Sequence, residues 1–252
     1  MSEFDAYHDS YRQEVARSIR FIRQDWDYFT AAKARALLDL AGRTLGEPKR
    51  LSALDVGCGV GHTARFLKGR FKRLYGVDPS ASSVERARDL NPEVEYRVGD
   101  GRRLPFENGS MDLVFAICVM HHVPPEDRPQ VAREMARVAK PNGVVAVFEH
   151  NPINPLTRRA VSNCRFDADA ELLSKQEAAR TLEEAGLQPL EARYIVFLPF
   201  GGQRLAAVER LLARVPLGAQ HFVAARSMPS RAAAAAAGTE PARWTVPLSS
   251  DG

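Results

Sequence analysis

LDVGCGVGHT, from Leu54 to Thr63, is the stretch of this sequence that decides the fold class. It begins in the short apolar run LSALDV (51–56) and leads into the helical pattern HTARFLKG (62–69). A strand that turns through glycines into a helix is typical of the first unit of an α/β fold. Glycine permits the tight turn, and the helix N-terminus offers unpaired N–H groups. We therefore expect a ligand site at this loop.

Strands and helices alternate after this loop. Helical patterns occupy 80–90 and 130–140, and Pro141-Asn142-Gly143 is expected to stop the second of these helices. Apolar runs of strand length predict further strands at Arg73–Asp78, Val94–Asp100, Met111–Val119 and Gly143–His150. This alternation predicts a mostly parallel sheet with helices on both faces.

The two ends of the chain have other patterns. A helical period between residues 11 and 40 predicts an N-terminal helical cap (1–48) over the ligand site. The main domain is expected over 49–226, with an ordered insertion or lid at about 151–173 that has no clean period. Residues 227–252 have little to bury and are expected to be a disordered tail.

The segment after the lid carries a second set of signals. Ser174 and Glu177 form a capping-box pattern that opens a helix ending near Gly186. A strand at 192–200, a helix at 203–215 and a strand at 219–225 follow. This arrangement is compatible with an antiparallel pair at the C-terminal edge of the sheet.

Composition excludes several classes of protein. The 252 residues are 45% hydrophobic and 26% charged, with a formal net charge of +4, as in one globular α/β domain. No apolar run is long enough to predict a membrane span, and the N-terminus has no apolar core of a secretory signal. Three widely spaced cysteines predict no disulfide framework, so we expect a cytoplasmic protein. No concentrated basic stripe predicts nucleic-acid binding.

Acidic residues at the strand ends distinguish the ligand. Gly57-x-Gly59-x-Gly61 departs from the G-x-G-x-x-G spacing that holds a pyrophosphate, and Asp55 would repel one but suits an ammonium group. Asp78 ends the second predicted strand, where a carboxylate can accept both hydroxyls of a ribose. Asp100, followed by Gly101, ends the third strand. We expect that strand beside the first, with Asp100 facing an adenine amino group.

Together these motifs resemble the class I S-adenosylmethionine-dependent methyltransferases, of the broad group that includes the ubiquinone-biosynthesis type and the type 11 methyltransferases. The resemblance covers roughly residues 11–226 and implies a Rossmann-like, seven-stranded, mostly parallel sheet with an antiparallel C-terminal edge strand. It also implies S-adenosylmethionine as cofactor and S-adenosylhomocysteine as product. The cofactor-binding residues that it implies are Tyr11, Asp55, Gly57, Cys58, Gly59, Gly61, Asp78, Pro79, Asp100, Gly101 and Cys118.

The resemblance also assigns a part of the cofactor to each group of residues. Asp55 and the loop glycines would surround the methionine part, with backbone from Cys118 nearby. Asp78 would hold the ribose, and Asp100 with Gly101 would hold the adenine. Tyr11 matches a tyrosine that often closes over the cofactor in this group.

Histidines at two strand ends are the candidates for catalysis. His121 and His122 follow the fourth predicted strand, and Glu149 and His150 end the fifth. Histidine is readily poised as a base near neutral pH, so we take His122 or His150 as the general base. No metal site is expected, because the adjacent pair His121-His122 has no Asp or Cys ligand at the usual helical spacing.

The predicted activity is transfer of a methyl group to a small-molecule, sugar or lipid-type acceptor, with oxygen as the expected acceptor atom. Nucleic-acid amino groups are not expected, because CVMHHVPP (118–125) stands where an Asn- or Asp-Pro-Pro-aromatic motif would be needed. Two alternatives stay open. One is a nicotinamide-dependent oxidoreductase, and the other is a non-catalytic cofactor-binding scaffold subunit.

Overall fold

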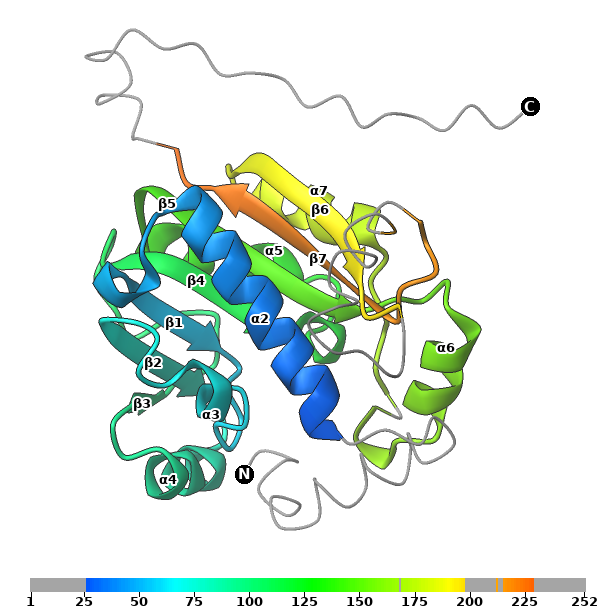
Figure 1. Cartoon of the computed structure of the whole chain (residues 1–252), viewed down its shortest axis with the longest axis horizontal. Helices are drawn as coiled ribbons and strands as arrows, with labels where there is room; N and C mark the ends of the chain where they lie inside the picture. The colour runs from blue at the N-terminus through cyan, green and yellow to red at the C-terminus, as the bar shows by residue number, and fades with distance from the viewer. Residues whose placement is uncertain (1–25, 168, 198–211, 213–214, 229–252) are drawn as a thin grey trace, which may run out of the picture.

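The structure is a computed structural model that describes residues 26–167, 169–197, 212 and 215–228. Within these residues seven strands form one sheet, in the order β3-β2-β1-β4-β5-β7-β6 (Figure 1). The strands are β1 (Ser52–Val56), β2 (Arg73–Asp78), β3 (Glu95–Val98), β4 (Met111–Ile117), β5 (Ala139–His150), β6 (Gln188–Ile195) and β7 (Gln220–Arg226). The first five strands pair with one another in parallel, as predicted. β7 runs antiparallel to both β5 and β6.

The C-terminal pair closes one edge of the sheet. The antiparallel strand is β7, which pairs with β5 over Val144–His150 and leaves β6 as the outermost strand. The edge is therefore built from the predicted C-terminal strand pair. The helix predicted at 203–215 falls almost wholly outside the described residues, as does the predicted tail from residue 229 onward.

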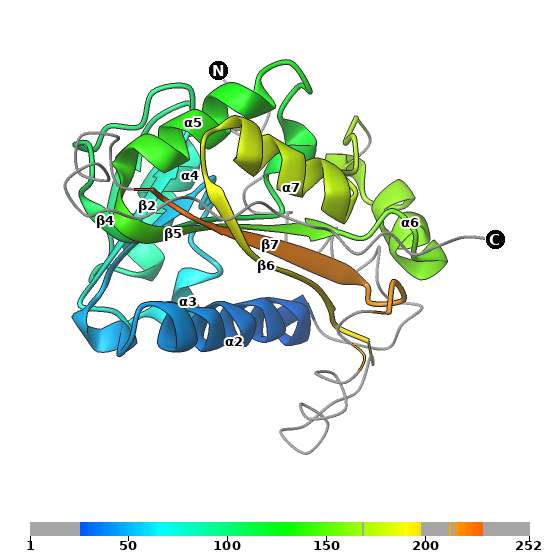
Figure 2. The same ribbon diagram turned by 90° about the horizontal axis from the view of Figure 1, so that it is seen from above.

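Helices cover both faces of the sheet (Figure 2). α2 and α3 lie on one side, while α5 and α7 lie on the other. The helices are α2 (Trp26–Thr44), α3 (Ala64–Leu67), α4 (Ala81–Leu90), α5 (Arg128–Val138), α6 (Pro155–Ser162) and α7 (Lys175–Glu184), with short 3-10 turns η3 (Pro48–Arg50), η4 (Met120–His122) and η5 (Arg165–Asp167). In the described part of the chain, no helix combines the length and the apolar character needed to cross a bilayer.

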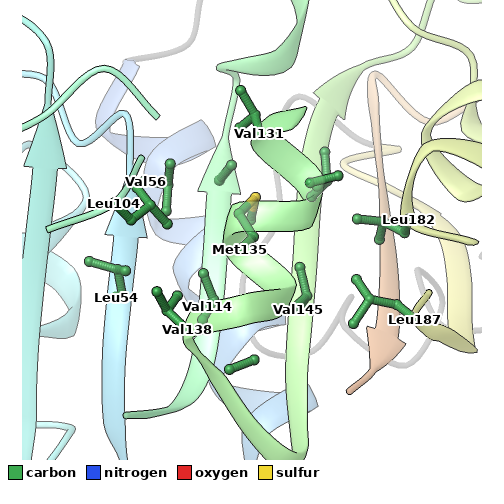
Figure 3. Close-up of a cluster of buried hydrophobic side chains, with 14 of the residues drawn as sticks. Leu54, Val56, Leu104, Val114, Val131, Met135, Val138, Val145, Leu182 and Leu187 are labelled. Atoms are coloured by element: carbon green, nitrogen blue, oxygen red, sulfur yellow. The ribbon is translucent and has the colours of Figure 1, made fainter. Parts of the chain in front are cut away.

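Alternate residues of the central strands supply two separate cores. Leu54 and Val114 point to the face covered by α5 and α7, and they belong to the same buried cluster as Met135 of α5 and Leu182 of α7 (Figure 3). Ala53, Phe115 and their strand-alternate neighbours pack on the other face against α2, α3 and α4. Burial on both faces explains why these strands read as continuous apolar runs rather than as alternating patterns.

Two element boundaries differ from the predictions. α5 ends at Val138, and β5 already begins at Ala139, so the stretch predicted to stop the helix lies within the strand. The register with β4 shifts there, from Met111 opposite Ala139 to Leu113 opposite Val144. Asn142 has a φ of +65°, which places the expected turn inside this bulge.

The predicted lid contains a helix that was not indicated by hydrophobic periodicity in the sequence. α6 begins after Asn154, whose side chain accepts hydrogen bonds from the N–H groups of Leu156 and Thr157. Pro155 occupies the first helical position, where its missing N–H costs nothing. The capping box at Ser174 and Glu177 is confirmed, and it opens α7 as predicted.

Candidate active site

The order of the strands creates a crevice at their carboxyl ends. β1 lies between β2 and β4, so the chain leaves β1 toward one edge of the sheet and later returns to begin β4 on the other side. Ligands of open α/β sheets bind at this kind of switch point. A cavity of about 570 Å³ lies there, lined by the loop after β1, by the ends of β2, β4 and β5, and by parts of α2 and α6. Its size is that of a small-molecule site.

The glycine loop follows the end of β1 closely. Gly57 has a φ of +74°, and a Cβ there would lie 2.5 Å from a methyl carbon of Val119. The N–H groups of Gly57 and Cys58 donate to the carbonyl of Val77 at 2.8 and 3.0 Å, which ties the loop to β2. A side chain at position 57 would therefore both strain the backbone and push the β4 loop away.

Two buried carboxylates face this loop. Asp78 accepts hydrogen bonds from the N–H of Gly59 at 2.7 Å and of Ser80 at 3.0 Å. Asp55 lies in the cavity wall, where burial, and then the charge of Asp78, raise its pKa well above the usual range. A positive ligand group beside Asp55 would offset both effects. Ser80, and not Asp78, caps α4, because its hydroxyl accepts from Ser83 N–H.

The third predicted acid lies in a turn of its own. The Asp100 carboxylate accepts from the N–H groups of Arg102 and Arg103 at 3.0 and 3.3 Å, and Asp100 and Gly101 both line the cavity. The expectation that the third strand lies beside the first is wrong, because β3 pairs with β2. Asp100 still reaches the cavity, since all the parallel strands end at the same edge of the sheet.

Cys118 lines the cavity and has an unusual backbone conformation. Its φ is +57°, and the Lys33 ammonium of α2 donates to its sulfur at 3.4 Å. Burial alone would raise the pKa of this thiol, but Lys33 and His150 outweigh burial and lower the pKa to about 7. The thiol of Cys118 is therefore partly ionised at neutral pH.

A buried ion pair orders the loop after β4. The Glu149 carboxylate accepts from the N–H groups of Val119 and Met120 at 3.1 and 2.8 Å and pairs with Nδ1 of His121 at 2.5 Å. Burial works against both charges, yet the partners raise the pKa of His121 to about 10 and lower that of Glu149 to about 2. Glu149 thus holds the histidine loop against the end of β5.

The two histidines predicted for catalysis both lie close to His121. The ring centroids of His122 and His150 lie 4.1 and 5.3 Å from that of His121, and both residues line the cavity. Burial and the charge of His121 lower the pKa of His122 to about 4. His122 is therefore neutral at physiological pH, and its basicity is low. His150, which is partly exposed, ends β5 at the cavity.

The structure brings nearly all of the predicted site residues together. Of the predicted site residues, those that line this cavity are Asp55, Gly57, Cys58, Gly59, Asp78, Pro79, Asp100, Gly101, Cys118, His122 and His150. Gly61 does not line it, because this glycine packs against Tyr96 and Asn91. Tyr11 lies outside the described residues.

Other lining residues were not predicted. Phe29, Thr30 and Lys33 come from α2, and Asp167 comes from the lid. Lys33 is a buried cation in an amphipathic helix. The hydrophobic periodicity of that helix did not indicate that one of its lysines is buried. Asp167 lies in a segment without hydrophobic periodicity, so the only sequence signal for a functional role was its acidic side chain.

Comparisons with known proteins agree with this geometry. A family model described as a methyltransferase domain matches residues 54–147. The chain is 31% identical over 188 residues to the 27-O-demethylrifamycin SV methyltransferase of Amycolatopsis mediterranei, covering 66% of each protein. It is also 31% identical over 155 residues to the 2-methyl-6-phytyl-1,4-hydroquinone methyltransferase of Synechocystis, covering 56% of this chain and 47% of that protein.

The fold has relatives among solved structures as well. An S-adenosylmethionine-dependent methyltransferase of Thermotoga maritima superposes with a TM-score of 0.63 at 20% identity, covering 89% of this chain and 97% of that one. The matched segments span between 32% and 53% of the length of the first three curated relatives. By its motifs, its strand order and these matches, the chain belongs to the class I S-adenosylmethionine-dependent methyltransferases.

Proposed function

We propose that this protein transfers the methyl group of S-adenosylmethionine to a hydroxyl oxygen of a mostly apolar small molecule. The observation that carries the proposal is that one cavity is lined both by the glycine loop with its acids and by a histidine cluster. We assign the loop and the acids to the cofactor end of the cavity and the histidines to the acceptor end, so that the methyl group of a bound cofactor would point toward the histidines.

The cofactor end offers a complementary group for each part of the cofactor. Asp55, whose burial makes its charge costly, would pair with the α-ammonium group. Asp78 already accepts two backbone hydrogen bonds, and a carboxylate has further lone pairs for the ribose hydroxyls. Asp100 and Gly101 would lie along the adenine. Tyr11 would close over the cofactor, as the resemblance implies.

The reaction would be a single in-line displacement. The acceptor oxygen attacks the methyl carbon, a C–O bond forms, and the C–S bond breaks with its electron pair passing to sulfur. S-adenosylhomocysteine leaves, and the hydroxyl proton passes to a base. Because the cofactor supplies the electrophile, the protein mainly aligns the reactants, which can be worth roughly 7–11 kcal/mol. A positioned base adds about 10²- to 10⁴-fold.

Both His150 and His122 are candidate bases. His122 is neutral at pH 7, but its pKa of about 4 makes it a weak base. His150 lines the cavity beside Cys118 and is less buried than His121. Substitution of His150 by Gln is therefore expected to lower kcat more than substitution of His122, and the reverse result would transfer the role to His122.

The acceptor end is formed largely by the lid. Thr157, Ala160, Val161 and Cys164 line it, and three of these four side chains have no charge or hydroxyl group. A mostly apolar acceptor would bury its surface there. The relatives named above include a protein named for O-methylation of a rifamycin and one named for a phytylated hydroquinone, and both names fit such an acceptor.

Thermal melting with S-adenosylhomocysteine, NAD and NADP tests the cofactor first. At a hundred times its dissociation constant a ligand stabilises by about 2.7 kcal/mol, or roughly 5–10 °C for a domain of this size. A shift with S-adenosylhomocysteine alone supports the proposal, and a shift with a nicotinamide cofactor alone would replace it with an oxidoreductase.

A panel of apolar phenols, hydroquinones and alcohols then tests the reaction. Mass spectrometry would detect the methylated product together with S-adenosylhomocysteine. Cofactor binding without product from any hydroxyl, amine or carbon acceptor would favour the scaffold alternative. A product methylated at carbon would keep the enzyme class and refute the oxygen assignment.

A further inference from the structure

The lid brings an acidic side chain to the two adjacent histidines. Asp167 Oδ1 lies 3.6 Å from Nε2 of His121 and 3.4 Å from Nε2 of His122. One potential ligand atom from each of the three residues falls within 4.8 Å of the other two. All three residues line the cavity, so a small ion has access to the space between them.

These separations suit a metal ion. Zinc binds imidazole nitrogen and carboxylate oxygen at about 2.0–2.2 Å in tetrahedral geometry, so two such ligand atoms lie about 3.4 Å apart. Neighbouring ligands of an octahedral magnesium ion would lie only about 2.9 Å apart. Two imidazoles and one carboxylate also favour first-row transition metals over magnesium or calcium. We propose that His121, His122 and Asp167 bind a divalent cation of the zinc type.

The first ligand is held in the orientation that metal binding needs. His121 Nδ1 pairs with the Glu149 carboxylate at 2.5 Å, which leaves Nε2 as the atom that faces Asp167. Carboxylate–histidine–metal arrangements of this kind orient the ring and raise the basicity of the ligand.

The two segments that carry the ligands are also fastened to each other. Glu171 N–H, four residues after Asp167, donates to the carbonyl of His121 at 2.9 Å. Arg128 donates to the carbonyl of Met120 at 3.0 Å and to that of Glu171 at 2.9 Å. The ligand atoms therefore come from a histidine loop and a lid segment joined by three hydrogen bonds.

The site would have a role in the reaction. Three protein ligands leave at least one position of a tetrahedral ion open, and because all three ligands line the cavity, that position would be accessible from it. A hydroxyl bound there would lose its proton more easily, as metal-bound water does. This role rests on the proposed O-methylation. With His122 used as a ligand, the proton would pass to His150.

Metal binding is measured on the full-length protein without cofactor, after removal of metal by a chelator. We expect one equivalent of Zn²⁺ by competition with a chromophoric chelator. We also expect one equivalent of Co²⁺, with the visible absorption of a four-coordinate ion. Asp167→Asn and His122→Gln should each weaken binding at least 10-fold, and Glu149→Gln, which removes the carboxylate that orients His121 without removing a ligand, by about 10- to 100-fold. His62→Gln, which changes a histidine of the loop after β1 that lines the same cavity, should bind normally.

Several results would overturn the site. They are the absence of stoichiometric Zn²⁺ and Co²⁺, equal binding in Asp167→Asn, His122→Gln and wild type, or a cobalt–thiolate charge-transfer band that places the ion on Cys118. Thermal melting of each variant separates loss of ligand from loss of fold. Because these readouts need no acceptor, the metal site and the proposed reaction can fail independently. If the protein bound metal but its turnover were unchanged after chelation, the metal site would stand and its proposed role in the reaction would be refuted.

Discussion

At the scale of single residues, the buried carboxylate of Asp55 destabilises the free protein when it is charged, and a bound cofactor would offset this effect. Its folded-state pKa is raised by burial and by Asp78, so its contribution to stability is present below pH 3.8 and is lost as pH rises through the folded-state pKa. We predict that Asp55→Asn raises the melting temperature of the free protein at pH 7, by roughly 2–4 °C for each kcal/mol relieved. The same change should weaken S-adenosylhomocysteine binding about 10- to 100-fold, since hydrogen bonds to charged groups contribute roughly 1.5–3 kcal/mol.

The comparison variant is Asp89→Asn, an exposed acid on α4. It should leave both the melting temperature and the affinity unchanged. Calorimetry and isothermal titration give the two quantities separately. If Asp55→Asn destabilised the free protein while binding S-adenosylhomocysteine as well as wild type, Asp55 would be a structural residue only.

Cys118 carries a second prediction at this scale. Because Lys33 and His150 lower the pKa of its thiol to about 7, alkylation by iodoacetamide should increase with pH around a midpoint near 7. Cys58 and Cys164 are buried and should react later. Saturating S-adenosylhomocysteine should slow alkylation at Cys118, because both would occupy the same cavity. Peptide mass spectrometry identifies the modified residue, and a midpoint near 9 would contradict the assignment.

At the scale of elements, Glu149 joins the end of β5 to the loop after β4. We predict that Glu149→Gln costs about 3–5 kcal/mol, as expected when one partner of a buried ion pair is removed. The raised pKa of His121 gives stability that is complete below pH 6.5 and disappears toward pH 10. The lowered pKa of Glu149 gives stability that is complete above pH 4.5 and disappears toward pH 2. The difference between variant and wild type should therefore peak between pH 4.5 and 6.5.

Urea unfolding at a series of pH values measures that difference. The matched control is Glu95→Gln, which removes an exposed ion pair with Arg97 and should change stability by about 1 kcal/mol or less. A difference that stayed constant from pH 4 to pH 10 would mean that His121 and Glu149 are not coupled through charge.

Elements with strong local signals were predictable, and those positioned by tertiary contacts were not. Apolar runs in the sequence predicted β1, β2 and β4, and the capping box predicted α7, because these signals depend only on residues that are close together in the chain. Asp167 gave no such signal: its approach to His121 joins positions 46 residues apart. A helix spacing rule therefore could not find the third ligand of the proposed metal site. β3 was placed beside the wrong strand for the same reason, since pairing order is not a local property.

At the scale of the whole molecule, the strand order puts the proposed cofactor contacts among the described residues, apart from Gly61, at the carboxyl ends of the parallel strands. Hydrogen exchange with saturating S-adenosylhomocysteine tests this arrangement across the chain in one measurement. We predict slower exchange at Gly57–Gly61, Asp100–Arg102 and Cys118–His122, by up to about 100-fold when the ligand stands at a hundred times its dissociation constant and exchange needs release.

Amides at the opposite edge serve as the internal control in the same experiment. Pro48–Arg50 precedes β1 and Asn108–Ser110 precedes β4, so both segments lie where the parallel strands begin. Their exchange should not change. Equal slowing at both ends of the parallel strands would indicate global stabilisation without a defined binding site. Slowing confined to the segments before β1 and β4 would place the cofactor at the beginnings of the strands and refute the proposed site. Only slowing at the carboxyl edge agrees with a ligand that spans β1, β2 and β4 where the strand order reverses.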